Sequence, residues 1–370
     1  MRILVSGMVA GVPGHGGATW AVLQYVLGFA RLGHEVVLIE PVEAAKPETI
    51  SYFRDVVDAF DLGDGAALLV AGTDETVGVP YERLIHLARD ADLLVNVSGM
   101  LRDPRLIEPV ETRVYLDRDP AFNQLWHTQG TDVGFEGHTS YVTVGQGLGR
   151  QGCPVPGCGL EWITTVQPVV LECWPVANGL DYKGLTTVGN WRGYGSIEHD
   201  GVHYGQKAHS FRGFFELPRR TAVPVFAGLA IHPGERDDLT ALRENGWRLL
   251  DPSEIGGTPD RYRRFVQSSW AELGIAKSGY VAAHCGWFSD RSVCYLASGR
   301  PVLAQETGFS DFLPTGEGLI PFATVDAVVA GVEELQRDYA RHRRAARALA
   351  EEVFDSDLVL SRLLEAVGAA

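Results

Sequence analysis

The sequence is short of two features, and each shortage excludes a class of protein. No run of about 18 apolar residues occurs in the 370-residue chain, so we expect no membrane-spanning helix and no integral membrane association. Positive charge is also scarce, because 32 Lys and Arg stand against 47 Asp and Glu, a formal net charge of −15. A polyanion would be repelled overall, so we expect no nucleic-acid partner.

Cysteine is equally scarce. The five cysteines form an odd set in a long chain, which favours reduced thiols in the cytoplasm over a disulfide framework. Cys153 and Cys158 would need a second pair at similar spacing to make a metal site, and only Cys173 follows closely. The first strand is interrupted by Gly7 too early for a secretory signal. We therefore expect a cytoplasmic protein without a bound metal.

The residues that are present have the composition of a globular protein, with 45% hydrophobic and 21% charged residues. The length favours two domains, each with its own core. In the first half, strand-like apolar runs alternate with apolar residues at helical spacing. Expected strands cover 2–9, 35–39, 68–71, 92–97 and 113–117, and expected helices cover 19–32, 51–60 and 81–90. This alternation predicts a doubly wound α/β domain with a parallel sheet.

The second half repeats the alternation after a proline-containing stretch at 168–175. Expected strands cover 185–191, 223–230, 247–250, 271–276 and 301–304, and expected helices cover 204–216, 237–245, 261–265 and 289–297. A helical tail follows over 325–339, continues to 352, and covers 357–367. The sequence thus predicts an α/β chain with two Rossmann-like domains in tandem, an N-terminal domain over 1–170 and a C-terminal domain over 171–350.

A glycine-containing turn near the C-terminus has the properties of a phosphate site. His284-Cys285-Gly286-Trp287 precedes a helix that Ser289 or Asp290 begins. Such a helix start offers free backbone N–H groups and a positive dipole end, which suit a phosphate. Gln305 and Glu306 then follow the next strand, at the end where open α/β sheets bind ligands.

The first domain carries a second glycine-rich loop, Gly14-His15-Gly16-Gly17-Ala18, before a helix that ends in Gly33-His34-Glu35-Val36. With the 284–309 region, this order of parts resembles the GT-B type of nucleotide-sugar-dependent glycosyltransferases. The resemblance implies a cleft between the two domains and a C-terminal helix, here 351–370, that returns to the first domain. It implies transfer of a sugar from a nucleoside diphosphate to a small-molecule or peptide-like acceptor hydroxyl, without a cofactor or metal.

The resemblance also implies a set of site residues. Arg192 follows the first strand of the second domain and Lys207 stands at the next helix start, the positions of diphosphate-binding cations in the family. The full set of expected donor-binding residues is Gly17, Arg192, Lys207, His284, Gly286, Ser289, Asp290, Arg291, Gln305 and Glu306.

His15 is the expected general base, because an imidazole with a pKa near 6.5 is largely free base at neutral pH. Asp117 or Asp119, at the end of an expected strand, would orient its ring. His127 and His138 lie in a glycine-rich stretch over 123–150 and are the expected acceptor-binding residues.

The sequence departs from the family at two positions. Cys294 stands where a carboxylate commonly holds the donor ribose, and Gly286 stands where retaining members place the first glutamate of a pair. Asp290 or Glu306 is a replacement for the missing ribose acid. The absent glutamate pair and the loop histidine favour inversion.

Three alternatives remain open. A nucleotide-sugar 2-epimerase of the same fold would release its product without an acceptor, and a non-catalytic GT-B-like protein would bind no nucleotide. An NAD-linked enzyme would use Glu40 on a ribose hydroxyl, although the glycines do not match G-x-G-x-x-G.

Overall fold

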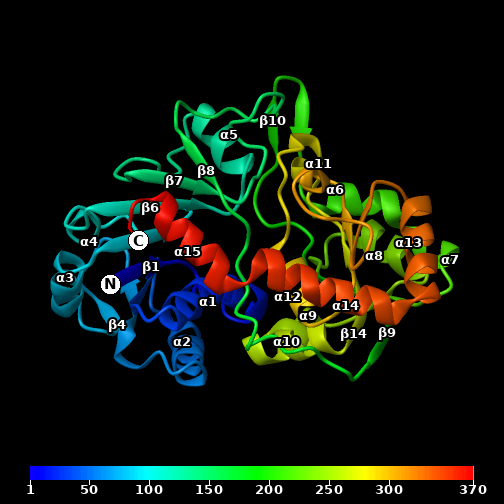
Figure 1. Ribbon diagram of the computed structural model, residues 1–370, viewed down its shortest axis with the longest axis horizontal. Helices are drawn as coiled ribbons and strands as arrows, with labels where there is room; N and C mark the ends of the chain where they lie inside the picture. Colours follow the sequence, from blue (N-terminus) through cyan, green and yellow to red (C-terminus); the bar gives the residue numbers. More distant parts are fainter. Residues whose placement is uncertain (370) are drawn as a thin grey trace.

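Two mainly parallel sheets organise the chain, and each forms the centre of one lobe (Figure 1). The computed structural model describes residues 1–369. The first sheet has eight strands in the order β4-β3-β2-β1-β5-β6-β7-β8, and only β4 runs antiparallel to its neighbour. Its strands are β1 Arg2–Ser6, β2 Glu35–Val42, β3 Ala66–Val70, β4 Thr76–Gly78, β5 Leu93–Val97, β6 Thr112–Asp117, β7 Ser140–Thr143 and β8 Trp162–Thr164.

Helices cover both faces of this sheet, as parallel strands require. In β1 the side chains of Ile3, Leu4 and Val5 are all fully buried, which is the pattern of a strand covered on both sides. The helices of this lobe are α1 Gly16–Arg31, α2 Pro47–Ala59, α3 Tyr81–Arg89, α4 Pro104–Ile107 and α5 Phe122–Thr128, with a short 3₁₀ turn η1 Gly63–Gly65.

The second sheet has six parallel strands in the order β13-β12-β9-β14-β15-β16. These strands are β9 Tyr182–Asn190, β12 Val225–Ala230, β13 Arg248–Leu249, β14 Ser269–Gly274, β15 Val302–Gln305 and β16 Leu319–Phe322. A small hairpin, β10 Ile197–His199 and β11 Val202–Tyr204, follows β9. In both sheets the strand order reverses beside the first strand, between β1 and β5 and between β9 and β14. Ligands of open α/β sheets bind at such switch points.

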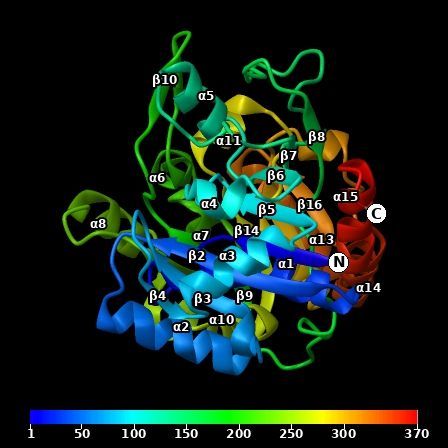
Figure 2. The ribbon, with the colours of Figure 1, turned by 90° about the vertical axis from the view of Figure 1, so that its left-hand side faces the viewer.

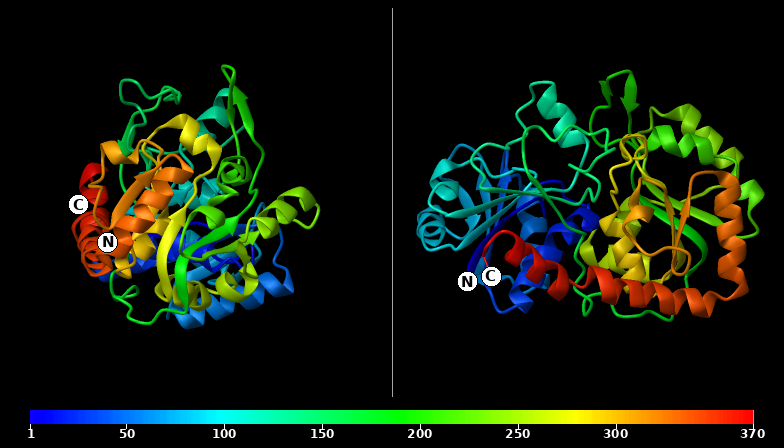
Figure 3. Two further views of the ribbon diagram at one scale, coloured as in Figure 1. Left: turned by 90° about the vertical axis from the view of Figure 1, so that its right-hand side faces the viewer. Right: turned by 45° about the horizontal axis from the view of Figure 1, so that its top comes forward.

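The helices of the second lobe are α6 Lys207–Phe211, α7 Leu217–Arg220, α8 Arg236–Glu244, α9 Pro252–Gly256, α10 Pro259–Gln267, α11 Ser278–Ala283, α12 Asp290–Ala297, α13 Val325–Arg337 and α14 Tyr339–Leu349. Short 3₁₀ turns lie at η2 Arg212–Phe214 and η3 Phe309–Asp311, and a π-helical turn η4 covers Ala350–Phe354. Figure 3 shows α14 and the last helix, α15 Ser356–Ala366, running along both lobes.

The chain crosses between the lobes twice, and the two crossings are hydrogen-bonded to each other. The Val169 amide donates to the Phe354 carbonyl at 2.7 Å, and the Ser356 amide donates to the Val169 carbonyl at 2.9 Å. Beyond this junction α15 packs on α1, where Arg31 pairs with Asp357 at 3.0 Å. Both termini therefore lie on the N-terminal lobe (Figure 2). The predicted fold class is confirmed, including the returning C-terminal helix.

Several local expectations were wrong. The expected helix over 204–216 is shorter and divided: Tyr204 belongs to the hairpin, α6 is followed directly by η2, and a separate helix, α7, begins at Leu217 with Pro218 in its first turn. The hairpin, α11 and β16 have no counterpart among the expected elements.

Candidate functional site

The switch point of the second sheet gathers buried cations. Lys207, the first residue of α6, donates from Nζ to the Ile275 carbonyl at 2.6 Å, just beyond β14. Burial holds the pKa of the Lys207 ammonium well below its ordinary value. Arg291, in the first turn of α12, directs its guanidinium to the same place, and both side chains flank Gly189 near the end of β9.

Among residues 1–369, the carboxylate that forms an ion pair with Arg291 is Glu272, and none pairs with Lys207. Arg291 Nε donates to Glu272 Oε1 on β14, and Glu272 is fully buried. Within residues 1–369 the second oxygen of Glu272 has no hydrogen-bond partner. Burial disfavours the charged form of Lys207, and a phosphate brought beside it would stabilise that charged form.

The predicted sugar-binding pair follows β15. Gln305 Oε1 accepts from the Ala276 amide at 3.1 Å, so Gln305 lies beside the loop that holds Lys207. Glu306 Oε1 accepts from the amides of Thr307 and Gly308, at 3.0 and 2.7 Å, and holds its own turn. The cavity at this place measures only about 10 Å³, room for a single water molecule. Its lining comprises Gly274, Ala276, Trp287, Phe288, Ser289, Arg291, Ser292, Ala304, Gln305 and Phe309.

The turn that carries Gly286 lies next to Trp287 of the cavity lining and contacts the N-terminal lobe. Gly286 has φ 77°, and a Cβ there would lie only 2.9 Å from the Phe312 ring and 3.0 Å from Gln146 Cβ. The Gly147 amide donates to the Cys285 carbonyl at 2.8 Å, which joins the two lobes at this turn. Gly286 thus allows the lobes to approach closely, whatever its role toward a donor.

The two residues after β6 reach across to the second lobe. Arg118 pairs with Asp290 at the start of α12, at 3.0 Å. Asp119 Oδ1 accepts from Tyr194 Oη at 2.6 Å, from Lys277 Nζ at 3.0 Å and from Tyr280 Oη. Despite burial, the Lys277 ammonium and these hydrogen bonds hold the pKa of the Asp119 carboxyl well below its usual range. An acid this strong is a poor proton acceptor.

Asp117, two residues earlier, is satisfied entirely within its own lobe. Its oxygens accept from Asn123 at 2.7 Å, Gln124 at 2.8 Å, Thr143 at 2.8 Å and the Asp119 amide at 3.1 Å. Burial raises the pKa of the Asp117 carboxyl to about 6. Asp117 therefore orders the start of α5 and the end of β7, and it makes no hydrogen bond with His15.

The first glycine-rich loop packs against the second lobe. His15 precedes α1, its side chain is half-buried, and within residues 1–369 that side chain makes no hydrogen bond. A Cβ on Gly17 would lie 2.8 Å from the Tyr262 ring, and Trp20 Nε1 donates to the Pro259 carbonyl at 2.8 Å. The loop therefore lies at the lobe boundary, as the resemblance implies, and Gly17 allows close packing there.

Glu40 binds the backbone of the same loop. Its carboxyl group accepts from the Ala10 amide at 2.8 Å and from the Gly11 amide at 2.6 Å. These two backbone N–H groups are therefore already hydrogen-bonded within the protein. Burial raises the pKa of the Glu40 carboxyl to about 7.

Other predicted residues lie away from the switch-point cations. Arg192 pairs with Glu235 on an exposed face, and His284 is exposed beyond α11. His127 is exposed on α5. His138 contacts Asn96 at 3.1 Å, and burial lowers the pKa of its imidazole. Cys294 faces α1, with Sγ 3.8 Å from Gln24 Nε2.

Lys277, Tyr194 and Tyr280 are the site residues that sequence reasoning missed. Lys277 directly follows the expected strand over 271–276, so the rule that places ligands at carboxyl ends of strands would have found it. Tyr194 stands between two glycines after β9 and carried no comparable signal.

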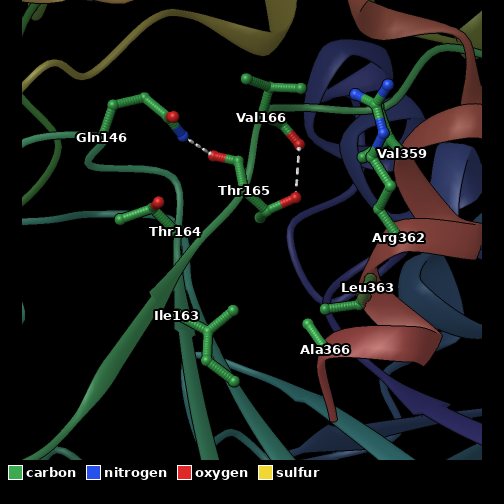
Figure 4. A pocket seen from close by; sticks show the side chains of 9 residues that line it. All are labelled: Gln146, Ile163, Thr164, Thr165, Val166, Val359, Arg362, Leu363 and Ala366. Carbon is green, nitrogen blue, oxygen red and sulfur yellow. Dashed lines mark hydrogen bonds between the residues drawn. The ribbon is translucent and has the colours of Figure 1, made fainter. Parts of the chain in front are cut away.

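A second cavity lies between the segment after β8 and α15, as Figure 4 shows. It measures about 170 Å³, and its lining comprises Gln146, Ile163, Thr164, Thr165, Val166, Val359, Arg362, Leu363 and Ala366. It borders the crossing between the lobes and shares none of the switch-point cations.

Within residues 1–369 no group of three metal-ligating side chains gathers at either cavity or elsewhere. Among the helices in that range, none combines the length and apolar character needed to cross a bilayer.

Several solved glycosyltransferases share this architecture. An alpha-glucosyltransferase in complex with UDP-glucose and DNA containing an abasic site superposes with a TM-score of 0.65, at 13% identity over 100% of this chain and 99% of that chain. HepE of Anabaena, in complex with UDP and glucose, gives 0.57 at 11% identity over 100% of both chains. AviGT4, a glycosyltransferase involved in avilamycin A biosynthesis, gives 0.54 at 15% identity over 99% of this chain and 97% of that chain.

No family model matches the sequence, and no curated protein matches it either. The structural likeness therefore shows the fold, and the predicted GT-B fold is confirmed.

Proposed function

We propose that this protein is a nucleotide-sugar-dependent glycosyltransferase that binds its donor in the C-terminal lobe. The observation that carries the proposal is the buried pair Lys207 and Arg291 at the switch point of a GT-B second sheet beside Gln305. Within residues 1–369 Arg291 pairs with Glu272, whereas Lys207 forms no ion pair, and a diphosphate would supply the missing anion. It would also offset the free-energy cost of burying the Lys207 ammonium, because a nearby anion stabilises the charged form of lysine.

The proposed reaction breaks the bond between the sugar anomeric carbon and the diphosphate oxygen, and the electron pair stays on that oxygen. Lys207 and Arg291 stabilise the charge that develops there. The acceptor hydroxyl oxygen forms the new bond from the opposite side, with inversion, and His15 takes its proton. No metal or other cofactor is needed in this scheme, since side chains neutralise the leaving group.

The donor site must open for this reaction, because the cavity beside Gln305 has room for only one water molecule. Its walls come from the second lobe, and Arg118, Asp119 and the Gly147 turn of the first lobe contact residues of the second lobe that stand next to the cavity lining in the sequence. A movement of one lobe away from the other would admit a nucleotide-sugar, a type of closure common in enzymes.

The proposed acceptor is a small or peptide-like hydroxyl compound. Some structural neighbours were solved with DNA, but the net charge of −15 on this chain opposes a polyanionic acceptor. The alpha-glucosyltransferase was solved with UDP-glucose and HepE with UDP and glucose, and a uridine nucleotide is therefore the first donor to test. We place the protein in the cytoplasm on its cysteine content.

The test is calorimetric titration of the full chain with UDP-, GDP- and dTDP-sugars and NAD, followed by the variants Lys207→Met and Arg192→Met. Loss of a charge-assisted hydrogen bond should weaken nucleotide-sugar binding by about 1.5–3 kcal/mol. We expect this loss for Lys207→Met, whereas Arg192→Met reports whether that exposed residue turns toward the phosphates. Binding of NAD alone, or equal nucleotide-sugar affinity in the parent and Lys207→Met, would overturn the proposal. Donor consumption without any acceptor would indicate the epimerase instead.

A further inference from the structure

Three hydrogen-bond donors of the second lobe meet at a single oxygen of the first lobe. Lys277 Nζ, Tyr194 Oη and Tyr280 Oη all donate to Oδ1 of Asp119. We call these three side chains the tripod. Each belongs to the second lobe, and the anion that they hold is supplied by the first lobe.

The tripod is held in place by contacts of its own. Lys277 Nζ lies 3.9 Å from the centre of the Tyr194 ring, a cation–π contact. Tyr280 is almost fully buried and stacks on Trp287 at 4.0 Å between ring centres. These contacts would persist if Asp119 left. Within residues 1–369, Asp119 is the only carboxylate that pairs with Lys277, so its departure would leave a partly buried ammonium without an anion.

The tripod lies on the switch point of the second sheet. Tyr194 follows β9, and Lys277 follows β14 in the same short loop whose backbone binds Lys207 through Ile275 and Gln305 through Ala276. Asp119 Oδ1 therefore lies at the same end of the second sheet as the proposed donor site. One carboxylate oxygen held by an ammonium and two hydroxyls has the hydrogen-bonding pattern of a bound phosphate oxygen.

We propose that the tripod is an oxyanion site of the donor lobe, that Asp119 is its internal ligand, and that a phosphate oxygen of the nucleoside diphosphate replaces Asp119 when the donor binds. That the external anion is a nucleoside diphosphate rests on the proposed function. The assignment of the tripod and of Asp119 as its internal ligand rests on the hydrogen bonds alone. Asp119 then acts as a competitor of the substrate, and it favours the closed arrangement of the lobes until the donor enters.

Competition makes a prediction with an unusual sign. When an internal ligand occupies the site in part of the molecules, the protein binds an external ligand with a lower apparent affinity. The smaller the fraction of molecules with a free site, the lower that affinity is. Asp119→Asn removes the charge that holds this ligand, so the affinity for a diphosphate should rise, by about tenfold if one ion pair is lost. Lys277→Met should lower the affinity by a similar factor, and Asp119→Asn should bring no gain in the Lys277→Met background.

Arg118→Met is the matched control. Arg118 is the neighbour of Asp119 and forms the other ion pair between the lobes, with Asp290, but it does not touch the tripod. If the variants acted only by loosening the lobes, Arg118→Met and Asp119→Asn would raise affinity alike. The competition mechanism requires the rise in Asp119→Asn alone.

The experiment titrates UDP and inorganic pyrophosphate separately into the full-length parent, the three single variants and the Asp119→Asn/Lys277→Met double variant. Circular dichroism and melting temperature confirm that each variant is folded. A rise confined to Asp119→Asn supports the proposal. Unchanged or weaker binding by Asp119→Asn, or an equal rise in Arg118→Met, overturns it.

These data, together with the Lys207→Met titration that tests the proposed function, separate this inference from that function. If pyrophosphate follows the expected pattern while UDP binds to no variant, the tripod is an oxyanion site and the proposed function fails. If UDP binds equally to parent and Asp119→Asn but Lys207→Met weakens it, the proposed function stands and the internal ligand is refuted.

Discussion

Glu40 provides a test of how the first glycine-rich loop is held in place. Its buried carboxylate binds the Ala10 and Gly11 amides of the loop that leads to His15. The pKa of this carboxyl is about 7 in the folded chain, against an ordinary value of 4.5. Such a shift is worth about 3 kcal/mol, because each pKa unit corresponds to about 1.36 kcal/mol.

The sign follows from the direction of the shift. A carboxyl with a raised pKa binds its proton more tightly in the folded state. Its contribution to stability is therefore fully present below pH 4.5 and is lost as the pH rises through about 7. Glu40→Gln mimics the protonated form in size and cannot ionise. The free energy of unfolding of this variant, minus that of the parent, should rise between pH 5 and pH 8 by up to about 3 kcal/mol.

Urea unfolding at several pH values, followed by tryptophan fluorescence, measures this difference. Trp20 lies on α1 directly after the loop and serves as the reporter. Taking the difference between the two proteins at each pH cancels the titration of all other groups that both share. A difference that stays constant from pH 5 to pH 8 would refute the reasoning, because it would mean that Glu40 has an ordinary pKa in the folded chain.

Two further predictions concern turnover. Glu306→Gln should lower turnover of a nucleotide-sugar far more than it lowers affinity for the bare nucleoside diphosphate. Steady-state kinetics measure the turnover, and calorimetry measures the affinity. Equal losses would mean that Glu306 only stabilises its own turn, where it binds the Thr307 and Gly308 amides. His15→Ala should reduce turnover by about 10²–10⁴-fold while nucleotide affinity is kept, and proton NMR of the product should show inversion. Activity within a few-fold of the parent, or a retained anomer, would contradict a general-base role for His15.

Much of the fold could be predicted from the sequence because parallel strands buried on both faces form apolar runs. The runs at 92–97 and 113–117 match β5 and β6 to within a residue. Short elements were not predicted, because a run of few residues shows no clear periodicity. β16 has only four residues and α11 has six, too short for either period to stand out.

The candidate site was predictable only where local pattern and chemistry agree. Lys207 and Gln305 follow from their places at a helix start and a strand end, and the structure brings both to the switch point. The partners of Asp119 do not follow from any local pattern, because Lys277 stands 158 residues away in the sequence. Pairings of that separation depend on how the two lobes pack, and a single sequence carries no record of it.

Asp117 and Asp119 show how packing assigns different roles to similar residues. Asp117 is the last residue of β6, and Asp119 lies two residues beyond it. All hydrogen bonds of the Asp117 carboxyl come from its own lobe, and burial raises its pKa to about 6. Asp119 takes its partners from the other lobe, and Lys277 lowers its pKa. If the lobes separate, Asp117 keeps every hydrogen bond, whereas Asp119 and Lys277 lose each other. Separation without an anion would leave Lys277 unpaired, which is unfavourable, and an arriving phosphate would remove that cost. The coupling between donor binding and lobe opening is therefore expected to depend on Asp119 and not on Asp117.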